Sequence, residues 1–178
     1  MHALADGLSV GRLLLAAVLP WALARGGWLA PLLFVVAAAS DYVDGPLARR
    51  AARASSYGGV LDNVADVAFV LAGTGTAAWL GLISWAAPAA IACSSGSYAL
   101  ASLRLSRGTA APRLARSRLG HWAGVCNYAC VGVVAGRTVA GPLLVAAAGW
   151  ITVVVNLAAV GRRWAGPTRR VDDGIEPA

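Results

Sequence analysis

Lysine is absent from this 178-residue chain, and acidic residues are scarce. All 15 basic side chains are arginines, and only eight side chains are acidic. Charged residues make up 13% of the chain and hydrophobic residues 58%, a balance too apolar for an ordinary soluble domain. The net charge of +7 would suit a nucleic-acid partner, but the arginines stand between apolar runs. Such a distribution is typical of loop charge in a membrane protein, so we expect no nucleic-acid partner.

Cysteine is also scarce. Cys93, Cys126 and Cys130 each lie within an apolar stretch. An odd number of cysteines in such surroundings argues against a disulfide framework. Cys126 and Cys130 are four residues apart and His121 is close in the sequence, which is compatible with a soft-metal site. We favour the simpler interpretation that the cysteines are packing residues.

Six apolar stretches account for most of the chain. They cover residues 10–24, 28–41, 60–82, 83–103, 119–135 and 139–160. A membrane-spanning helix needs about 20 residues, which three of the stretches reach alone and three reach with their polar ends. The pattern predicts an all-α fold, an integral membrane bundle of six transmembrane helices. A short N-terminal interfacial segment over residues 1–9 should end where Asp6 or Ser9 caps the first helix. We expect one domain over 1–165 and a cytoplasmic tail over 166–178.

The arginines predict the orientation of this bundle. Six spans place thirteen arginines on the side that holds both termini, and only Arg25 and Arg137 on the other side. Because cytoplasmic loops of membrane proteins carry an excess of arginine, both termini should be cytoplasmic. We expect the protein to lie in a bacterial inner membrane.

Four aspartates gather in one segment, whereas no acid occurs between residues 66 and 172. Asp41 and Asp44 are three residues apart and Asp62 and Asp66 are four apart, so each pair shares one helical face. Carboxylates close to lipid are costly, and they repel one another unless something positive joins them. The predicted orientation puts both pairs at the cytoplasmic ends of two spans. Hard oxygen ligands there favour Mg²⁺ or Mn²⁺.

The same segment carries a longer pattern, D-x2-D-G-x2-A-R-x8-G-x3-D-x3-D. Its eight fixed positions are Asp41, Asp44, Gly45, Ala48, Arg49, Gly58, Asp62 and Asp66. In these positions the chain resembles the CDP-alcohol phosphotransferases, also called CDP-alcohol phosphatidyltransferases. The resemblance implies a membrane enzyme that uses a CDP-linked lipid, usually CDP-diacylglycerol. An acceptor hydroxyl would attack the phosphorus that bears the lipid, and CMP would leave.

The resemblance also implies roles for individual side chains. The four aspartates would hold two metal ions, and Asp66 would also be the general base. The CDP-lipid would contact Asp6, Ser9, Gly45, Ala48, Arg49, Ser55 and Gly58. Asp6 and Ser9 are similar to a looser element of the family that an arginine follows, here Arg12. Homodimers are common in the family, so the resemblance implies a homodimer as well.

The acceptor alcohol is less well defined. Basic residues around the fourth and fifth stretches are candidates to bind a phosphate on it, although simple topological charge is an alternative. They are Arg104, Arg107, Arg113, Arg116, Arg118 and His121. Many phosphatidylglycerophosphate synthases of the family have a lysine after the last aspartate, where this chain has Val67, and Gly-Lys-x-Lys-Thr where it has Gly-His-Trp-Ala-Gly over 120–124. We predict glycerol 3-phosphate as the acceptor, with an inositol phosphate as the alternative.

A divalent-cation transporter is the alternative from another class of protein. A transit pathway needs acidic or polar groups along several spans and toward both membrane faces. The four aspartates are instead predicted at one face only, which favours the enzyme. A non-catalytic homologue is a third possibility, and the complete eight-residue pattern argues against it.

Overall fold

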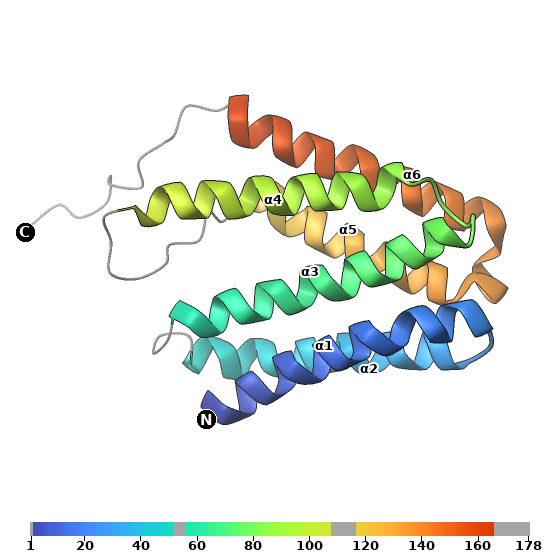
Figure 1. Cartoon of the computed structure of the whole chain (residues 1–178), viewed down its shortest axis with the longest axis horizontal. Coiled ribbons are helices and arrows are strands. Elements are labelled where there is room, and N and C mark those ends of the chain that lie inside the picture. The colour runs from blue at the N-terminus through green and yellow to red at the C-terminus, as the bar shows by residue number, and fades with distance from the viewer. Residues whose placement is uncertain (1, 52–55, 108–116, 166–178) are drawn as a thin grey trace, which may run out of the picture.

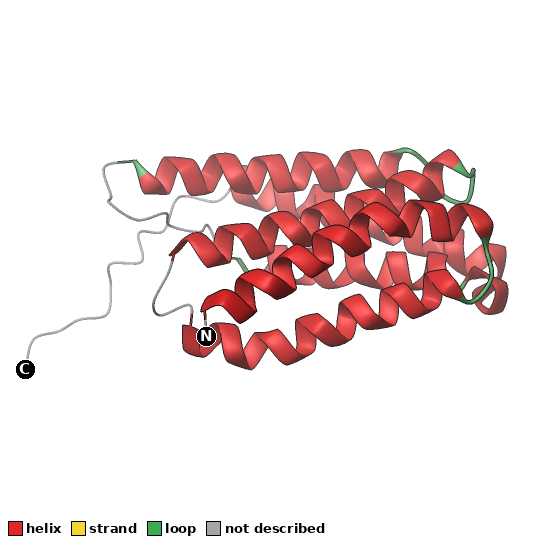
Figure 2. Cartoon of the chain, turned by 60° about the horizontal axis from the view of Figure 1, so that its bottom comes forward, coloured by secondary structure: helices red, strands yellow, loops and turns green. Residues whose placement is uncertain are grey.

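The computed structural model describes residues 2–51, 56–107 and 117–165, and within these ranges the chain is helical and contains no β-strand. The helices are α1 (His2–Arg25), α2 (Leu29–Ala51), α3 (Ser56–Trp79), α4 (Ala86–Ser106), α5 (Arg118–Ala135) and α6 (Arg137–Ala165). They run lengthwise in one bundle (Figures 1 and 2). The all-α prediction is confirmed for the described residues. The predicted tail over 166–178 lies outside them.

Two groups of helices make up the bundle. Helix α1 packs against α3 and α2, helix α6 packs against α5 and α4, and α3 joins the groups by contacting α4 and α5. The core between them is apolar and includes Leu19, Phe69, Ile91 and Val131, all of them buried. The start of α1, the end of α2, the start of α3 and the ends of α4 and α6 lie at one end of the bundle (Figure 1). The end of α2 and the start of α3, which carry the two pairs of aspartates, therefore lie at the same end of the bundle.

Helix α1 begins at His2, so the N-terminal residues are not a separate segment. Neither Asp6 nor Ser9 stands at the start of the helix, and the prediction that one of them caps it is wrong. Residues 2–9 contain no proline, and extending a helix costs less free energy than starting a new one. Helix α2 likewise continues ten residues beyond the predicted apolar stretch and carries the first half of the motif.

Among the residues that the structure describes, two helices are long and apolar enough to cross a membrane by length and composition. They are the segment Val60–Trp79 of α3 and the whole of α6, Arg137–Ala165. Large apolar side chains also face outward, among them Leu14 of α1 and Leu143 and Trp150 of α6. Both features are compatible with the predicted membrane spans. Whether all six helices span the bilayer stays a prediction.

The turn after α3 shows how the sequence ends a helix. Gly81 has φ 71°, a left-handed conformation that glycine adopts without a steric penalty. The Leu82 amide donates to the Ala77 carbonyl at 2.9 Å, and the Gly81 amide donates to the Ala78 carbonyl at 3.0 Å. This pair of bonds is a Schellman motif, which satisfies carbonyls that the helix leaves without intrahelical partners. The chain can then reverse into α4 within a few residues.

Gly132→Ala is expected to lower the stability of the bundle. A Cβ atom at Gly132 would lie 2.7 Å from Cζ and 2.8 Å from Cε1 of Phe34, so the ring of α2 has to move away from α5. Overpacking of this kind costs about 1–3 kcal/mol, which exceeds or offsets the preference of about 1 kcal/mol of a helix for alanine over glycine. Thermal unfolding in detergent measures the change.

Gly124→Ala, on the same helix, is the matched control. A Cβ atom there meets nothing within 4 Å, so only the helix preference operates and stability should stay equal or rise. Equal unfolding temperatures for the Gly132 and Gly124 variants would contradict the close contact between α2 and α5.

Candidate active site

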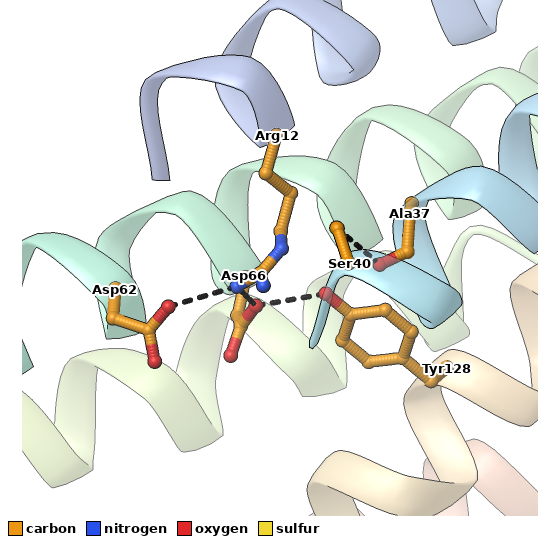
Figure 3. A network of polar contacts seen from close by, with 6 residues as sticks. All are labelled: Arg12, Ala37, Ser40, Asp62, Asp66 and Tyr128. Atoms are coloured by element: carbon orange, nitrogen blue, oxygen red, sulfur yellow. Dashed lines mark hydrogen bonds and ion pairs between the residues drawn. The ribbon is translucent and has the colours of Figure 1, made fainter. Parts of the chain in front are cut away.

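Two aspartates of the motif converge on a buried arginine. Asp62 and Asp66 lie one turn apart on α3, and α1 packs alongside so that Arg12 reaches both (Figure 3). Arg12 Nη1 donates to Asp62 Oδ1 at 2.9 Å and also to Asp66 Oδ1. The Arg12 side chain is completely buried, whereas 45% of the Asp62 side chain and 31% of the Asp66 side chain are exposed. The guanidinium of Arg12 is therefore shielded from solvent, whereas the two carboxylates remain accessible.

Asp66 has a second anchor on α5. The Tyr128 hydroxyl donates to Asp66 Oδ1 at 2.8 Å (Figure 3). The Tyr128 ring stacks on Phe69, with ring centroids 5.7 Å apart and an angle of 20° between the planes. Because Phe69 is buried, this stack holds the phenol in place. Arg12 and Tyr128 together fix the orientation of the Asp66 carboxylate from two helices.

A cavity of about 620 Å³ opens beside Asp66. Helices α2 to α6 all line it, and Phe34 and Ala38 are the contribution of α2. Its polar lining consists of Asn63, Asp66, Ser94, Ser95, Tyr98, Ser117, His121, Asn127, Tyr128, Asn156 and Arg163. A mostly apolar wall with a few convergent polar groups is the usual form of a small-molecule site, and this volume is within the usual range.

The predicted acceptor residues are distributed unevenly around this cavity. His121 lines it, and with Arg118 it also borders a smaller hollow at the start of α5. Arg104 does not line either hollow, because its guanidinium stacks on Trp164, 4.7 Å from the ring centroid. Arg107 is the C-cap residue that follows α4, and it does not line the cavity. Arg113 and Arg116 lie outside the described residues.

The remaining motif residues are located only by their backbone. Asp41, Asp44, Gly45, Ala48 and Arg49 lie in the last part of α2, and Gly58 lies near the start of α3. Asp6 and Ser9 lie in α1. The side chains of all eight are outside what the structure describes, and so is Ser55 altogether. The structure thus brings together Asp62 and Asp66, and leaves the other predicted positions as predictions.

Four polar residues of the site escape the motif. Arg12 and Tyr128 contact Asp66, and Asn127 and Asn156 line its cavity. None of the four belongs to the eight-residue pattern, although Arg12 follows the looser element that contains Asp6 and Ser9. Arg163 joins them from α6, where Nη1 donates to the Ser94 carbonyl at 3.1 Å and to Ser97 Oγ at 2.6 Å. A signal was present in the sequence, because asparagines inside apolar stretches commonly mark a functional site.

The pair on α3 is suited to a hard divalent cation. Two carboxylates one turn apart already meet at a single cationic nitrogen, Arg12 Nη1, and hard oxygen donors are the ligands that Mg²⁺ and Mn²⁺ prefer. In the described part of the chain no three His, Cys, Asp or Glu side chains gather in one place. The side chains of the second pair, Asp41 and Asp44, lie outside the part of the chain that the structure describes. The donor chemistry therefore fits the predicted ions, and the full ligand set stays a prediction.

The helical bundle thus places a pair of accessible carboxylates beside a cavity with convergent polar groups, an arrangement that suits an enzyme acting on a small polar substrate. A comparison with protein families matches residues 2–159 to the CDP-alcohol phosphatidyltransferases, and the chain belongs to that family. No curated protein matches it. The protein is accordingly an enzyme of phospholipid synthesis that transfers a substituted phosphate group from a CDP-alcohol. The family assignment favours this activity over the divalent-cation transport considered above.

Proposed function

We propose that this enzyme transfers the phosphatidyl group of CDP-diacylglycerol to glycerol 3-phosphate and releases CMP. The observation that carries the proposal is that Asp66, held by Arg12 and Tyr128, lines the cavity together with several other polar groups. A small acceptor in that cavity would have its hydroxyl beside a carboxylate of fixed orientation. A group that accepts the hydroxyl proton has to be within hydrogen-bond reach of it.

The first pair of aspartates is proposed to face the same space. Phe34 and Ala38 of α2 line the cavity four residues apart. Asp41 follows Ala38 by three residues, which continues the same helical face. This register supports the convergence of Asp41 and Asp44 with Asp62 and Asp66 as ligands of two ions, Mg²⁺ or Mn²⁺. When bound, such ions neutralise the diphosphate and stabilise the attacking and leaving oxygens.

The protein's own groups then have separate tasks. Asp66 accepts the proton of the acceptor hydroxyl. The hydroxyl oxygen of the acceptor then forms a bond to the phosphorus that carries diacylglycerol, and the bond from that phosphorus to the CMP oxygen breaks. Arg49 holds a phosphate of the nucleotide, with Asp6, Ser9, Ala48 and Ser55 around it. Gly45 and Gly58 leave room for the nucleotide because they have no side chain. Tyr128 and Arg12 keep Asp66 turned toward the cavity.

The proposal places the reaction at the cytoplasmic face of a bacterial inner membrane. All six helices would span the bilayer as one domain over residues 1–165, and a homodimer is proposed from the family. The arginine distribution supports this orientation, and the start of α1, the end of α6 and the start of α3, the helix that carries Asp62 and Asp66, lie at the same end of the bundle (Figure 1). A soluble acceptor would enter from the cytoplasm, and the lipid would enter from the side.

An acceptor screen tests the proposed reaction. Purified protein in detergent is given labelled CDP-diacylglycerol, Mg²⁺ or Mn²⁺, and a panel of acceptors that includes glycerol 3-phosphate, an inositol phosphate, serine and ethanolamine. Release of CMP should require glycerol 3-phosphate and should stop when EDTA removes the ions. If CMP is released only with an inositol phosphate, that compound is the acceptor in place of glycerol 3-phosphate. If CMP is not released with any acceptor in the panel, the proposed function is overturned.

A further inference from the structure

A pair of buried asparagines crosses the interface between α5 and α6. Asn127 is 8% exposed and Asn156 is 1% exposed. Asn156 Nδ2 donates to Asn127 Oδ1 at 2.6 Å and to the Thr152 carbonyl at 2.9 Å. A backbone carbonyl can only accept, so the Thr152 carbonyl defines which side-chain atom of Asn156 is the nitrogen. The atom of Asn127 that faces this nitrogen is consequently its oxygen.

This arrangement leaves one donor group and one acceptor directed at the cavity. Both hydrogens of Asn156 Nδ2 are in use, whereas Asn156 Oδ1 and Asn127 Nδ2 have no bond to any other described group. Both residues line the cavity beside Asp66, and both of these atoms remain accessible from it. A ligand that filled the cavity without bonding these two atoms would take them out of water and leave them unpaired, which is costly. An amide pair in an apolar interior is therefore better suited to a bound polar ligand than to packing alone.

A hydroxyl group fits this pair because it donates and accepts at once. We infer that Asn127 and Asn156 bind a second hydroxyl of the acceptor, so that the enzyme requires a polyol. This inference rests on the proposed function. Asn127 and Asn156 line the same cavity as Asp66, so both hydroxyls of the acceptor would lie in one site. The first hydroxyl is the nucleophile, and the second sets the position of the carbon chain.

Arg163 indicates what the other end of the acceptor carries. It lines the same cavity seven residues after Asn156, two helical turns or about 10 Å along α6. Its Nη1 is held by Ser94 and Ser97 of α4, and Nη2 makes no hydrogen bond to any described group. A guanidinium fixed through one nitrogen presents its other donors to an anion. The site therefore suits a short polyol with an anionic group at its far end.

Two acceptors that differ by one hydroxyl test the inference. Glycerol 3-phosphate and 3-hydroxypropyl phosphate share the primary hydroxyl and the phosphate, and only the first has the secondary hydroxyl. We expect the enzyme to prefer glycerol 3-phosphate by at least about 100-fold in kcat/KM, because a site built to bind a hydroxyl rejects an analogue that lacks it. In Asn127→Leu and Asn156→Leu the ratio of the two kcat/KM values should fall toward one.

The ratio separates recognition from a merely structural role. A structural effect lowers both rates equally and leaves the ratio unchanged, and that result would overturn the inference. Thr76→Val, which removes a hydroxyl of α3 that does not line the cavity, is the control and should keep the ratio. A wild-type enzyme that uses both acceptors equally well would overturn the inference even if neither leucine variant folds. CMP would still be released in that case, so the proposed function would stand, whereas no release with any acceptor would reject the function itself.

Discussion

Asp66→Asn is expected to abolish the release of CMP from CDP-diacylglycerol, with a loss of at least about 10³-fold, while the protein still folds and inserts into the membrane. Positioned general bases contribute about 10²–10⁴-fold to a rate, and the substitution would also remove a negative charge from the proposed metal site. The asparagine oxygen can still accept from Tyr128 and Arg12, so the network around position 66 keeps its shape. Labelled CMP is measured after separation from the lipid.

Asp62→Asn is the matched control for this substitution. It lies one turn away on the same face and contacts the same Arg12 nitrogen, but it has no bond to Tyr128. Its activity should fall less than that of Asp66→Asn, and a higher concentration of Mg²⁺ or Mn²⁺ should restore part of it. Turnover retained in Asp66→Asn would remove Asp66 from the role of base. Equal and metal-insensitive losses in both variants would indicate that the two carboxylates share one structural role.

Arg12→Leu is expected to destabilise the protein strongly when divalent cations are absent. Arg12 is buried and neutralises both carboxylates, so its loss leaves two negative charges facing each other. Removal of one partner of a buried ion pair costs about 3–5 kcal/mol, and a value near the lower limit is expected because both aspartates are partly exposed. A divalent cation can take over the neutralisation. Thermal unfolding in EDTA and in Mg²⁺ should therefore differ more for Arg12→Leu than for the wild type.

Arg137→Leu provides the comparison for Arg12→Leu. Arg137 also anchors one helix to another, but Nη2 donates to the Leu23 carbonyl at 2.8 Å, and no described carboxylate pairs with it. Its loss should lower the unfolding temperature by the same amount with and without Mg²⁺. If Mg²⁺ leaves the Arg12→Leu variant as unstable as EDTA does, the carboxylate pair does not bind the cation.

Spacing along the chain is enough to predict six helices and the shared face of Asp62 and Asp66. Both features depend on helical periodicity, which is local in the sequence. The boundaries are less well predicted, because apolar composition ends before the helix does. Helix α2 continues to Ala51 through a charged segment, and α1 starts at His2 rather than after a capped turn. The thickness of the lipid determines the length of the apolar run, whereas backbone hydrogen bonding and helix propagation determine where the helix begins and ends.

The surroundings of the aspartates are harder to predict. Arg12 is 50 residues from Asp62 and Tyr128 is 62 residues from Asp66, and no periodicity relates such distant positions. The predicted acceptor residue Arg104 turns to Trp164 instead, and Arg163 takes a place on the cavity. Arginines near helix ends look alike in a sequence, since topology alone requires them. Which of them faces a substrate depends on the rotation of each helix in the bundle.

The order of residues alone establishes the helical class, the acidic motif and, through that motif, the family. Those properties need only the spacing of neighbouring side chains. The contact of Arg12 and Tyr128 with one carboxylate oxygen, and the amide pair of Asn127 and Asn156 beside it, arise only when four helices pack together. Helix packing sums many weak contacts between distant segments, so no short stretch of sequence contains the information that places these groups in one cavity.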